Sequence, residues 1–228
     1  MKLLSTLAVK GVLDELGPAF ERARGVTIEI VFDPTAVMLP RIRAGEQADI
    51  AILTRDGIDR LIADGVLAAG SRLDLARSEV GIAVAAGARK PDISTVEAFR
   101  RTLLDAKSIV YSRAGASGIF FARLIDELGV AAEVNAKATI VPGGFTAETV
   151  AAGKAEIAVQ QVSELMVVPG VDVVGALPQA IQEYLDFAGA VFAGAADEAT
   201  GAELLRFLAG AEHAAVYKRR GLLGLTGS

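Results

Sequence analysis

The first seventy residues alternate between short apolar runs and segments whose apolar residues recur every three or four positions. Three runs predict strands: residues 2–7, 26–32 and 48–53. Each is followed by a turn and the spacing of an amphipathic helix, over residues 9–24, 33–47 and 54–70. Pro18 should kink the first helix or start a new turn, and Gly25 should end it. This alternation predicts a parallel, doubly wound α/β sheet.

Two longer β-prone segments, residues 78–87 and 183–194, enclose a second series of strands and helices. We interpret them as crossings, so that the second α/β unit is inserted into the first and the C-terminal helices complete the first. The predicted lobes are residues 1–80 with 188–228, and residues 81–187. Two lobes around a cleft are a common arrangement for binding a small ligand.

Composition narrows the classes of protein. Of 228 residues, 52% are hydrophobic and 22% charged, as in a globular chain, and a net charge of −5 without a long basic run argues against nucleic acid as a partner. The absence of cysteine excludes disulfides and thiolate metal sites, and the single His213 makes a histidine metal site or a Ser–His–Asp triad improbable. We therefore expect no metal and no cofactor.

Membrane insertion is not expected, because no apolar run reaches the 18 or so residues that span a bilayer. Near the N-terminus, Lys10, Asp14 and Glu15 interrupt the apolar run too soon for a secretory signal. We therefore expect the protein to be periplasmic if a leader was removed and cytoplasmic otherwise.

Small polar residues follow the predicted strands, immediately before helices. The candidate ligand-binding residues at these places are Ser5, Thr6, Thr35, Ser112, Arg113, Ser117, Gly118, Gly143 and Gly144. In open α/β sheets ligands bind at the carboxyl ends of strands, where helix N-termini offer N–H groups to anions. Each Ser or Thr could instead be an ordinary helix cap, and Arg113 a solvated loop residue. Gln160 and Gln161 also end a strand, where a buried amide would need a partner, although a solvated strand end is the alternative.

Nucleotide binding is disfavoured by spacing. The stretch "GASG" at residues 115–118 lacks the G-x-G-x-x-G pattern of dinucleotide-binding loops. The stretch "AGKAEIA" lacks both the upstream glycine of a phosphate loop and a Ser or Thr after Lys154.

The pattern "G-x-x-ADI" before one strand and "G-x-AEIA" before another is typical of a known family. Over nearly its whole length the chain resembles the molybdate-type substrate-binding proteins of ABC transporters. The segments that carry the resemblance are residues 4–32, 44–65, 93–129 and 141–165. It implies the type II periplasmic-binding-protein fold, an ABC permease as partner if the protein is exported, and an oxyanion held by Ser5 or Thr6 and by Thr35.

The chain departs from the molybdate binders at three places. "DPTA" replaces a glycine followed by serines, no tyrosine stands near Gln161, and "SRAGASG" replaces a proline-containing loop. "GASGI", "VPGG" and "QQ-x-SEL" are similar to a subgroup that includes aconitate isomerase. This resemblance, with Arg113 as a carboxylate ligand, implies a di- or tricarboxylate rather than molybdate.

Two functions remain open at this point. The first is a solute-binding protein whose lobes close on a small anion, which needs no residue of unusual pKa. The alternative is an enzyme that shifts a double bond in a tricarboxylate, with a base such as Asp33 or Glu164. Glu164 could also be an ordinary acidic residue at the start of a helix.

Overall fold

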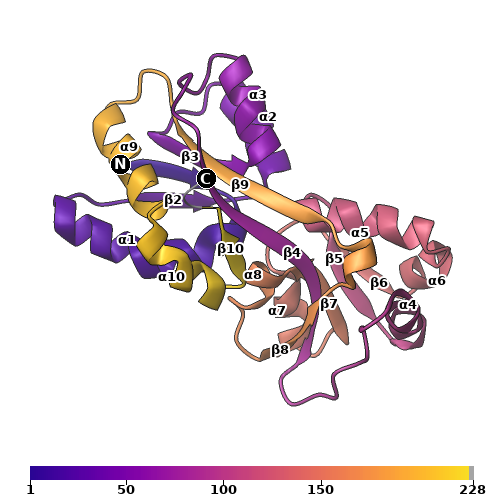
Figure 1. Ribbon diagram of the computed structural model, residues 1–228. Helices are drawn as coiled ribbons and strands as arrows, with labels where there is room; N and C mark the ends of the chain where they lie inside the picture. The colour runs from indigo at the N-terminus through magenta and orange to yellow at the C-terminus, as the bar shows by residue number, and fades with distance from the viewer. Residues whose placement is uncertain (226–228) are drawn as a thin grey trace. The chain divides into compact units, whose positions relative to one another are not determined.

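A computed structural model describes residues 1–225 and divides the chain into two compact units (Figure 1). Unit 1 contains Met1–Arg77 and the segment from Leu185 onward, and unit 2 is Ser78–Tyr184. The divisions lie close to the predicted boundaries after residues 80 and 187. The chain passes between the units inside two strands, β4 (Leu73–Ala85) and β9 (Tyr184–Val191).

Unit 1 is built on three parallel strands and one antiparallel strand. β1 (Lys2–Ser5) pairs in parallel with β2 (Glu29–Phe32) on one side and β3 (Ile50–Thr54) on the other, and β9 runs antiparallel to β3. Ser5 is level with Phe32 and Ile52, so the carboxyl ends of the three parallel strands lie together. The parallel order follows from the alternation of strand and helix in the sequence.

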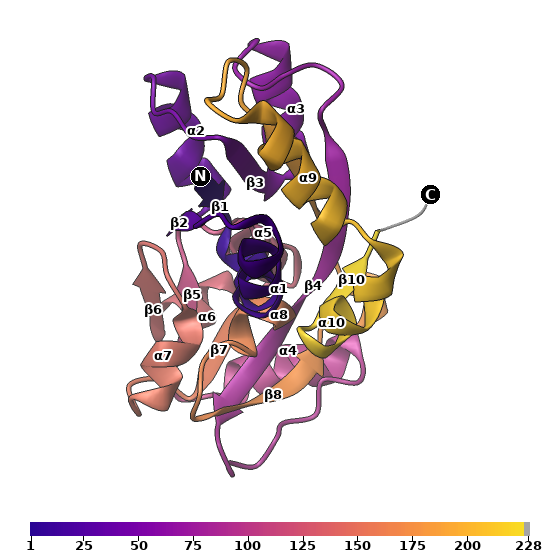
Figure 2. The same ribbon diagram turned by 90° about the vertical axis from the view of Figure 1, so that its left-hand side faces the viewer.

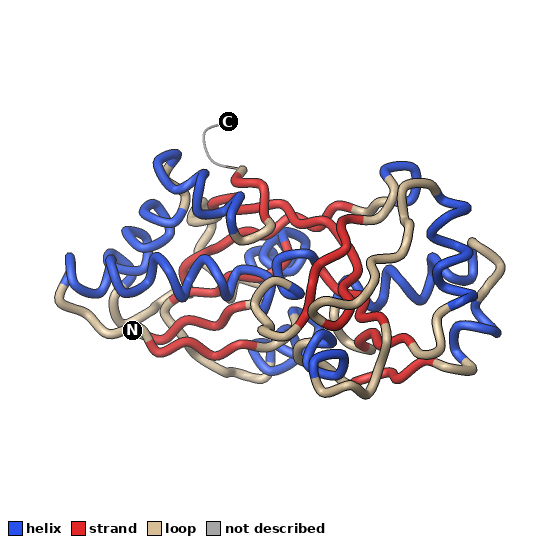
Figure 3. Tube along the Cα trace, turned by 90° about the horizontal axis from the view of Figure 1, so that it is seen from below, coloured by secondary structure: helices blue, strands red, loops and turns tan. Residues whose placement is uncertain are grey.

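Helices cover both faces of this sheet (Figure 3). Their bounds are Leu7–Val9 (η1), Lys10–Arg24 (α1), Thr35–Arg43 (α2), Arg55–Ala63 (α3), Glu198–Leu208 (α9), Ala211–His213 (η3) and Ala214–Arg219 (α10). α1 contacts α9 and α10, so the C-terminal segment completes unit 1 (Figure 2). A short strand, β10 (Leu222–Gly224), pairs with β4.

α1 continues through Pro18, where the sequence predicts a kink or a new turn. It buries Val12, Leu13, Leu16 and Phe20 in the core of unit 1, and this packing offsets the hydrogen bond that proline cannot donate. The predicted end is confirmed: Gly25 follows α1 with a left-handed φ of 65°, which glycine adopts without steric cost.

Unit 2 has a parallel core of three strands. β5 (Ile109–Ser112) lies between β6 (Ala138–Val141) and β7 (Ile157–Gln161), and β4 runs antiparallel to both β7 and β8 (Val171–Ala176). The surrounding helices are Val96–Asp105 (α4), Ala116–Glu127 (α5), Ala131–Asn135 (α6), Thr146–Ala151 (α7), Val162–Leu165 (α8) and Gln179–Ile181 (η2). Thr95 caps α4 by accepting a hydrogen bond from the N–H of Ala98.

The register of these parallel strands brings three loops to one edge of unit 2. Ser112 is level with Val141, and Val110 is level with Ala158, so two residues further on Ser112 is level with Gln160. The loops before α5 and α7 and the start of α8 therefore leave the sheet together. Most residues predicted to bind a ligand lie at this edge.

Candidate functional site

Two serine hydroxyls lie buried at the end of β5 and the start of α5. Ser112 is 2% exposed and Ser117 is 1% exposed. Neither Oγ has a hydrogen-bond partner within residues 1–225. A buried hydroxyl without a partner costs free energy, and native proteins seldom leave one unsatisfied. These two hydroxyls therefore point to a ligand that accepts hydrogen bonds.

Two glycines bring the β5–α5 loop close to these hydroxyls. A Cβ on Gly115 would stand 2.4 Å from Ser112 Oγ and 3.9 Å from Ser117 Oγ. A Cβ on Gly118 would stand 1.8 Å from the carbonyl oxygen of Ser112. Glycine at 118 lets α5 pack directly on the end of β5, and glycine at 115 leaves room between the hydroxyls.

The first turn of α5 adds backbone donors to the same place. Its N-cap is Gly115, which supplies no side-chain cap, and its first turn holds no acidic residue. The first N–H groups of a helix have no partner within the helix and carry partial positive charge. An anion beside Ser117 would find hydroxyls, N–H groups and the positive end of a 12-residue helix.

Arg113 supplies a cation next to Ser112. Its backbone N–H donates to the carbonyl of Val141 at 2.8 Å, which holds the loop beside the end of β6. Its side chain is exposed, and no ion pair joins it to a carboxylate of residues 1–225. A guanidinium in this position can bind a carboxylate through two parallel hydrogen bonds.

Gln160 fixes the loop that holds Gly143 and Gly144. Its Oε1 accepts hydrogen bonds from the N–H of Thr146 at 2.8 Å and from Thr146 Oγ1 at 2.9 Å, and its Nε2 donates to the carbonyl of Gly144 at 2.9 Å. Gly144 has a left-handed φ of 82°. The amide that we expected to contact a ligand is thus bonded to the protein and positions the loop.

Gln161 is buried like Gln160 but is only partly satisfied. Its Oε1 has no partner within residues 1–225. Its place in β7 is two residues after Val159, on the sheet face opposite that of Gln160. Gln161 therefore remains a candidate ligand contact. In this orientation of the side chain, the atom without a partner within residues 1–225 is the amide oxygen, which accepts hydrogen bonds.

Glu164 is a buried residue of α8, the short helix that follows Gln161. It is 5% exposed, and burial raises its pKa to about 8. Hydrogen bonds from the Gln160 side chain and the Gln161 backbone favour the charged form but do not outweigh desolvation. The position early in a helix was visible in sequence, whereas burial depends on the packing of α8 against β7 and β8.

The raised pKa of Glu164 predicts a pH-dependent stability. The folded protein holds this proton from the ordinary carboxyl pKa of 4.5 up to about 8, whereas the unfolded chain releases it. Wild type should therefore lose stability relative to Glu164→Gln as pH rises through that window, by a few kcal/mol in all. Melting temperatures of both proteins at pH 5 to 9 measure this. Parallel stability curves for wild type and Glu164→Gln would contradict the raised pKa.

The candidates in unit 1 are already bonded to the protein in part. Ser5 Oγ donates to the carbonyl of Thr6 at 3.1 Å, and Thr35 Oγ1 accepts from the N–H of Thr54 at 3.1 Å. The hydroxyl of Thr6 is buried and makes no capping hydrogen bond. Asp33 lies at the same sheet edge, but its carboxylate is paired with Arg41 at 2.5 Å. A ligand role for Ser5, Thr6 and Thr35 stays a prediction.

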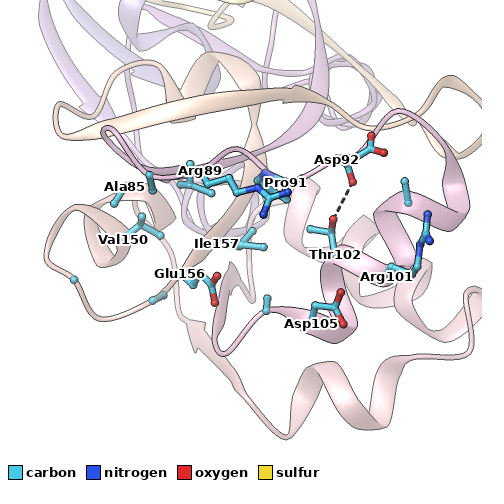
Figure 4. Close-up of a pocket in the computed structure, with 16 residues that line it drawn as sticks. Ala85, Arg89, Pro91, Asp92, Arg101, Thr102, Asp105, Val150, Glu156 and Ile157 are labelled. Carbon is cyan, nitrogen blue, oxygen red and sulfur yellow. Dashed lines mark hydrogen bonds between the residues drawn. The ribbon is translucent and has the colours of Figure 1, made fainter.

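A cavity of about 580 Å³ lies at the other end of the unit 2 sheet (Figure 4). It is lined by the end of β4, the start of β7 and one face of α4, and its lining is mostly apolar. Arg89 and Pro91 stand on one side of it and Asp105 on another. None of the buried side-chain atoms that lack a partner belongs to its lining within the described residues. The strand-end cluster is therefore the better candidate site.

Neither a metal site nor a membrane span is found in the part of the chain that the structure describes. No three His, Cys, Asp or Glu side chains of residues 1–225 gather closely enough to hold a metal ion. None of the helices in these residues has the length and apolar character needed to cross a bilayer.

Comparison with solved structures supports the predicted fold. The periplasmic molybdate-binding protein of Azotobacter vinelandii is 16% identical and aligns over 98% of both chains with a TM-score of 0.81. The sulfate-binding protein of Mycobacterium tuberculosis is 16% identical, with a TM-score of 0.77 over 99% of this chain and 86% of that one. The type II periplasmic-binding-protein fold is thus confirmed.

Sequence comparison identifies the family. An aconitate isomerase from a Pseudomonas species is 34% identical over 97% of this chain and 87% of the relative. The family model of bacterial extracellular solute-binding proteins matches residues 1–223. The chain therefore belongs to the bacterial extracellular solute-binding protein family.

Proposed function

We propose that this protein binds a small di- or tricarboxylate at the start of α5. The observation that carries the proposal is the pair of buried hydroxyls of Ser112 and Ser117 beside the helix N-terminus, which have no hydrogen-bond partner in the described part of the chain. One carboxylate of the ligand accepts from these donors. The exposed guanidinium of Arg113, which has no ion pair within residues 1–225, binds a second carboxylate.

The choice of carboxylate over a tetrahedral oxyanion rests on charge and shape. The molybdate and sulfate binders share the fold with this chain at 16% identity, which says nothing of its ligand. A planar guanidinium matches the two oxygens of a carboxylate, and a di- or tricarboxylate can reach both Arg113 and the serine pair. The name of the 34% identical relative, aconitate isomerase, also favours a tricarboxylate.

Membership of the extracellular solute-binding family supports a location outside the cytoplasmic membrane. In that setting we propose that the protein delivers its ligand to an ABC permease. The partner in solution is then the small anion, and neither nucleic acid nor a lipid bilayer is required.

A thermal-shift screen tests the ligand class. We expect citrate or an aconitate isomer to raise the melting temperature by mass action, and molybdate, tungstate and sulfate to leave it unchanged. Ser117→Ala should weaken carboxylate binding about tenfold or more, since a hydrogen bond to a charged group contributes about 1.5–3 kcal/mol. Ser94→Ala, at an exposed serine of the same unit, is the control and should bind normally. Stabilisation by molybdate alone would refute the carboxylate proposal.

A second function, isomerisation of aconitate, is favoured by a separate observation. Glu164 is a buried carboxyl whose pKa of about 8 suits proton transfer near neutral pH, which binding alone does not require. Incubating the protein with trans-aconitate and following the cis isomer by NMR distinguishes the enzyme from the binding protein. Stabilisation without conversion at high protein concentration would leave solute binding as the sole function.

A further inference from the structure

Isomerisation of aconitate requires one proton to move between two carbons. A C–H bond of the methylene breaks, its electron pair forms the new double bond to the central carbon, and the old double bond shifts its electrons to the far carbon. That carbon then forms a C–H bond with the returned proton. The atoms and charge of substrate and product are equal, so a single carboxylate that accepts and returns the proton completes the reaction.

We propose that Glu164 is the catalytic residue that carries this proton in unit 2. The inference rests on isomerisation, the second candidate function above. It identifies the acid–base group of that reaction, a role for which Asp33 was the other candidate in the sequence.

The place of Glu164 relative to the predicted ligand loops supports this role. The Gln160 side chain donates to the Glu164 carboxyl and, through Nε2, to the carbonyl of Gly144. The side-chain amide of Gln160 thus connects the Glu164 carboxyl to the Gly143–Gly144 turn through hydrogen bonds. Gln160 is level with Ser112 across the sheet, so the loop, the serine pair and the carboxyl belong to the same edge of unit 2.

Within residues 1–225, no cation contributes to the pKa shift of the Glu164 carboxyl. Among the elements that contact α8, β7 has no titratable residue, and β8 has only Asp172, whose carboxylate accepts from the N–H of Gly87. β4 touches α8 where the Ser78 and Ser163 hydroxyls meet at 3.4 Å, and it carries Asp74, Arg77 and Glu79. The Arg77 guanidinium is paired with Asp186 at 2.6 Å. The raised pKa of Glu164 comes from burial.

A carboxylate without a counter-ion in a dry setting is a stronger base than one in an ion pair. Asp33 differs in its surroundings, since its carboxylate is paired with Arg41 at 2.5 Å. A carboxyl with a pKa of about 8 is present in both forms near neutral pH, so Glu164 can accept a proton and give it back. The helix N-terminus of α5 and Arg113 would stabilise the anion that forms between the two transfers.

The decisive variant is Glu164→Gln, which keeps the shape and removes the base. With trans-aconitate as substrate and NMR as the readout, we expect kcat to fall about 10²–10⁴-fold, while the thermal shift produced by aconitate persists. Glu164→Asp should retain part of the activity. Wild-type kcat/KM should rise with pH up to about 8, because the charged carboxylate is the reactive form. A merely structural role would not produce this profile.

Two controls separate Glu164 from other carboxyls. Glu156→Gln changes an exposed acid at the other end of β7 and should convert aconitate like wild type. Conversion by Glu164→Gln at the wild-type rate would overturn the assignment while leaving isomerisation intact, and so would loss of conversion in Asp33→Asn alone. If wild type binds aconitate but does not convert it, the catalytic role falls and solute binding stands.

Discussion

Gly118→Ala should destabilise the protein by about 3 kcal/mol, because the added Cβ has no space. It would stand 1.8 Å from the carbonyl oxygen of Ser112 and 2.7 Å from its carbonyl carbon. Both are backbone atoms of β5, so relief requires α5 to move away from the strand. Overpacking of this kind costs about 1–3 kcal/mol and occasionally more. A 1.8 Å approach to a backbone atom belongs among the costlier cases, at about 4 kcal/mol. The higher helix propensity of alanine returns about 1 kcal/mol of this, which leaves a net loss of about 3 kcal/mol.

Thermal or urea unfolding measures this loss, with Gly17→Ala as the matched control. Gly17 is buried in α1, and a Cβ there would meet nothing within 4 Å. The same substitution should therefore leave stability unchanged or raise it by up to about 1 kcal/mol. Equal stabilities for the two variants would show that α5 does not approach β5 as closely as we describe.

Local patterns were sufficient to predict the fold class and the first three strands and helices of unit 1. The alternation of apolar strands and amphipathic helices is a short-range property, and glycines such as Gly25 mark helix ends through their own φ preference. Pro18 shows the limit of such patterns. A proline inside a helix removes one hydrogen bond and favours an interruption. The apolar face that α1 buries in the core of unit 1 stabilises the helix by more than this loss, so α1 continues through Pro18.

The sequence predicts candidate donors at the strand ends, but the hydrogen-bonding state of each residue could not be predicted from it. Ser112 and Ser117 stand where strand-end donors were expected, and their lack of partners is visible only once the chain is folded. Gln160 was expected to need a partner, and it bonds to Thr146, which is fourteen residues earlier. Glu164 looked like an acid at a helix start, and its pKa depends on burial by segments distant in sequence. Tertiary contacts decide these properties.

Gly115→Ala should abolish ligand binding while largely preserving the fold. The backbone of Gly115 has φ −71° and ψ 142°, which alanine adopts without strain. Its Cβ would stand 2.4 Å from Ser112 Oγ, the end of a side chain that can rotate away, and would occupy the space between the two hydroxyls. We expect a loss of affinity for the stabilising carboxylate of at least about 100-fold, or about 2.7 kcal/mol.

Titration calorimetry with that carboxylate measures the loss, and the melting temperature without ligand reports the fold. Gly17→Ala again serves as the control and should bind like wild type. The double variant Gly115→Ala/Ser112→Ala removes the hydroxyl that the new Cβ would meet. It should recover any lost stability without recovering affinity, because both the space and a donor are then gone. Wild-type affinity in Gly115→Ala would mean that the ligand does not lie between Ser112 and Ser117, and the proposed carboxylate site at the start of α5 would be wrong.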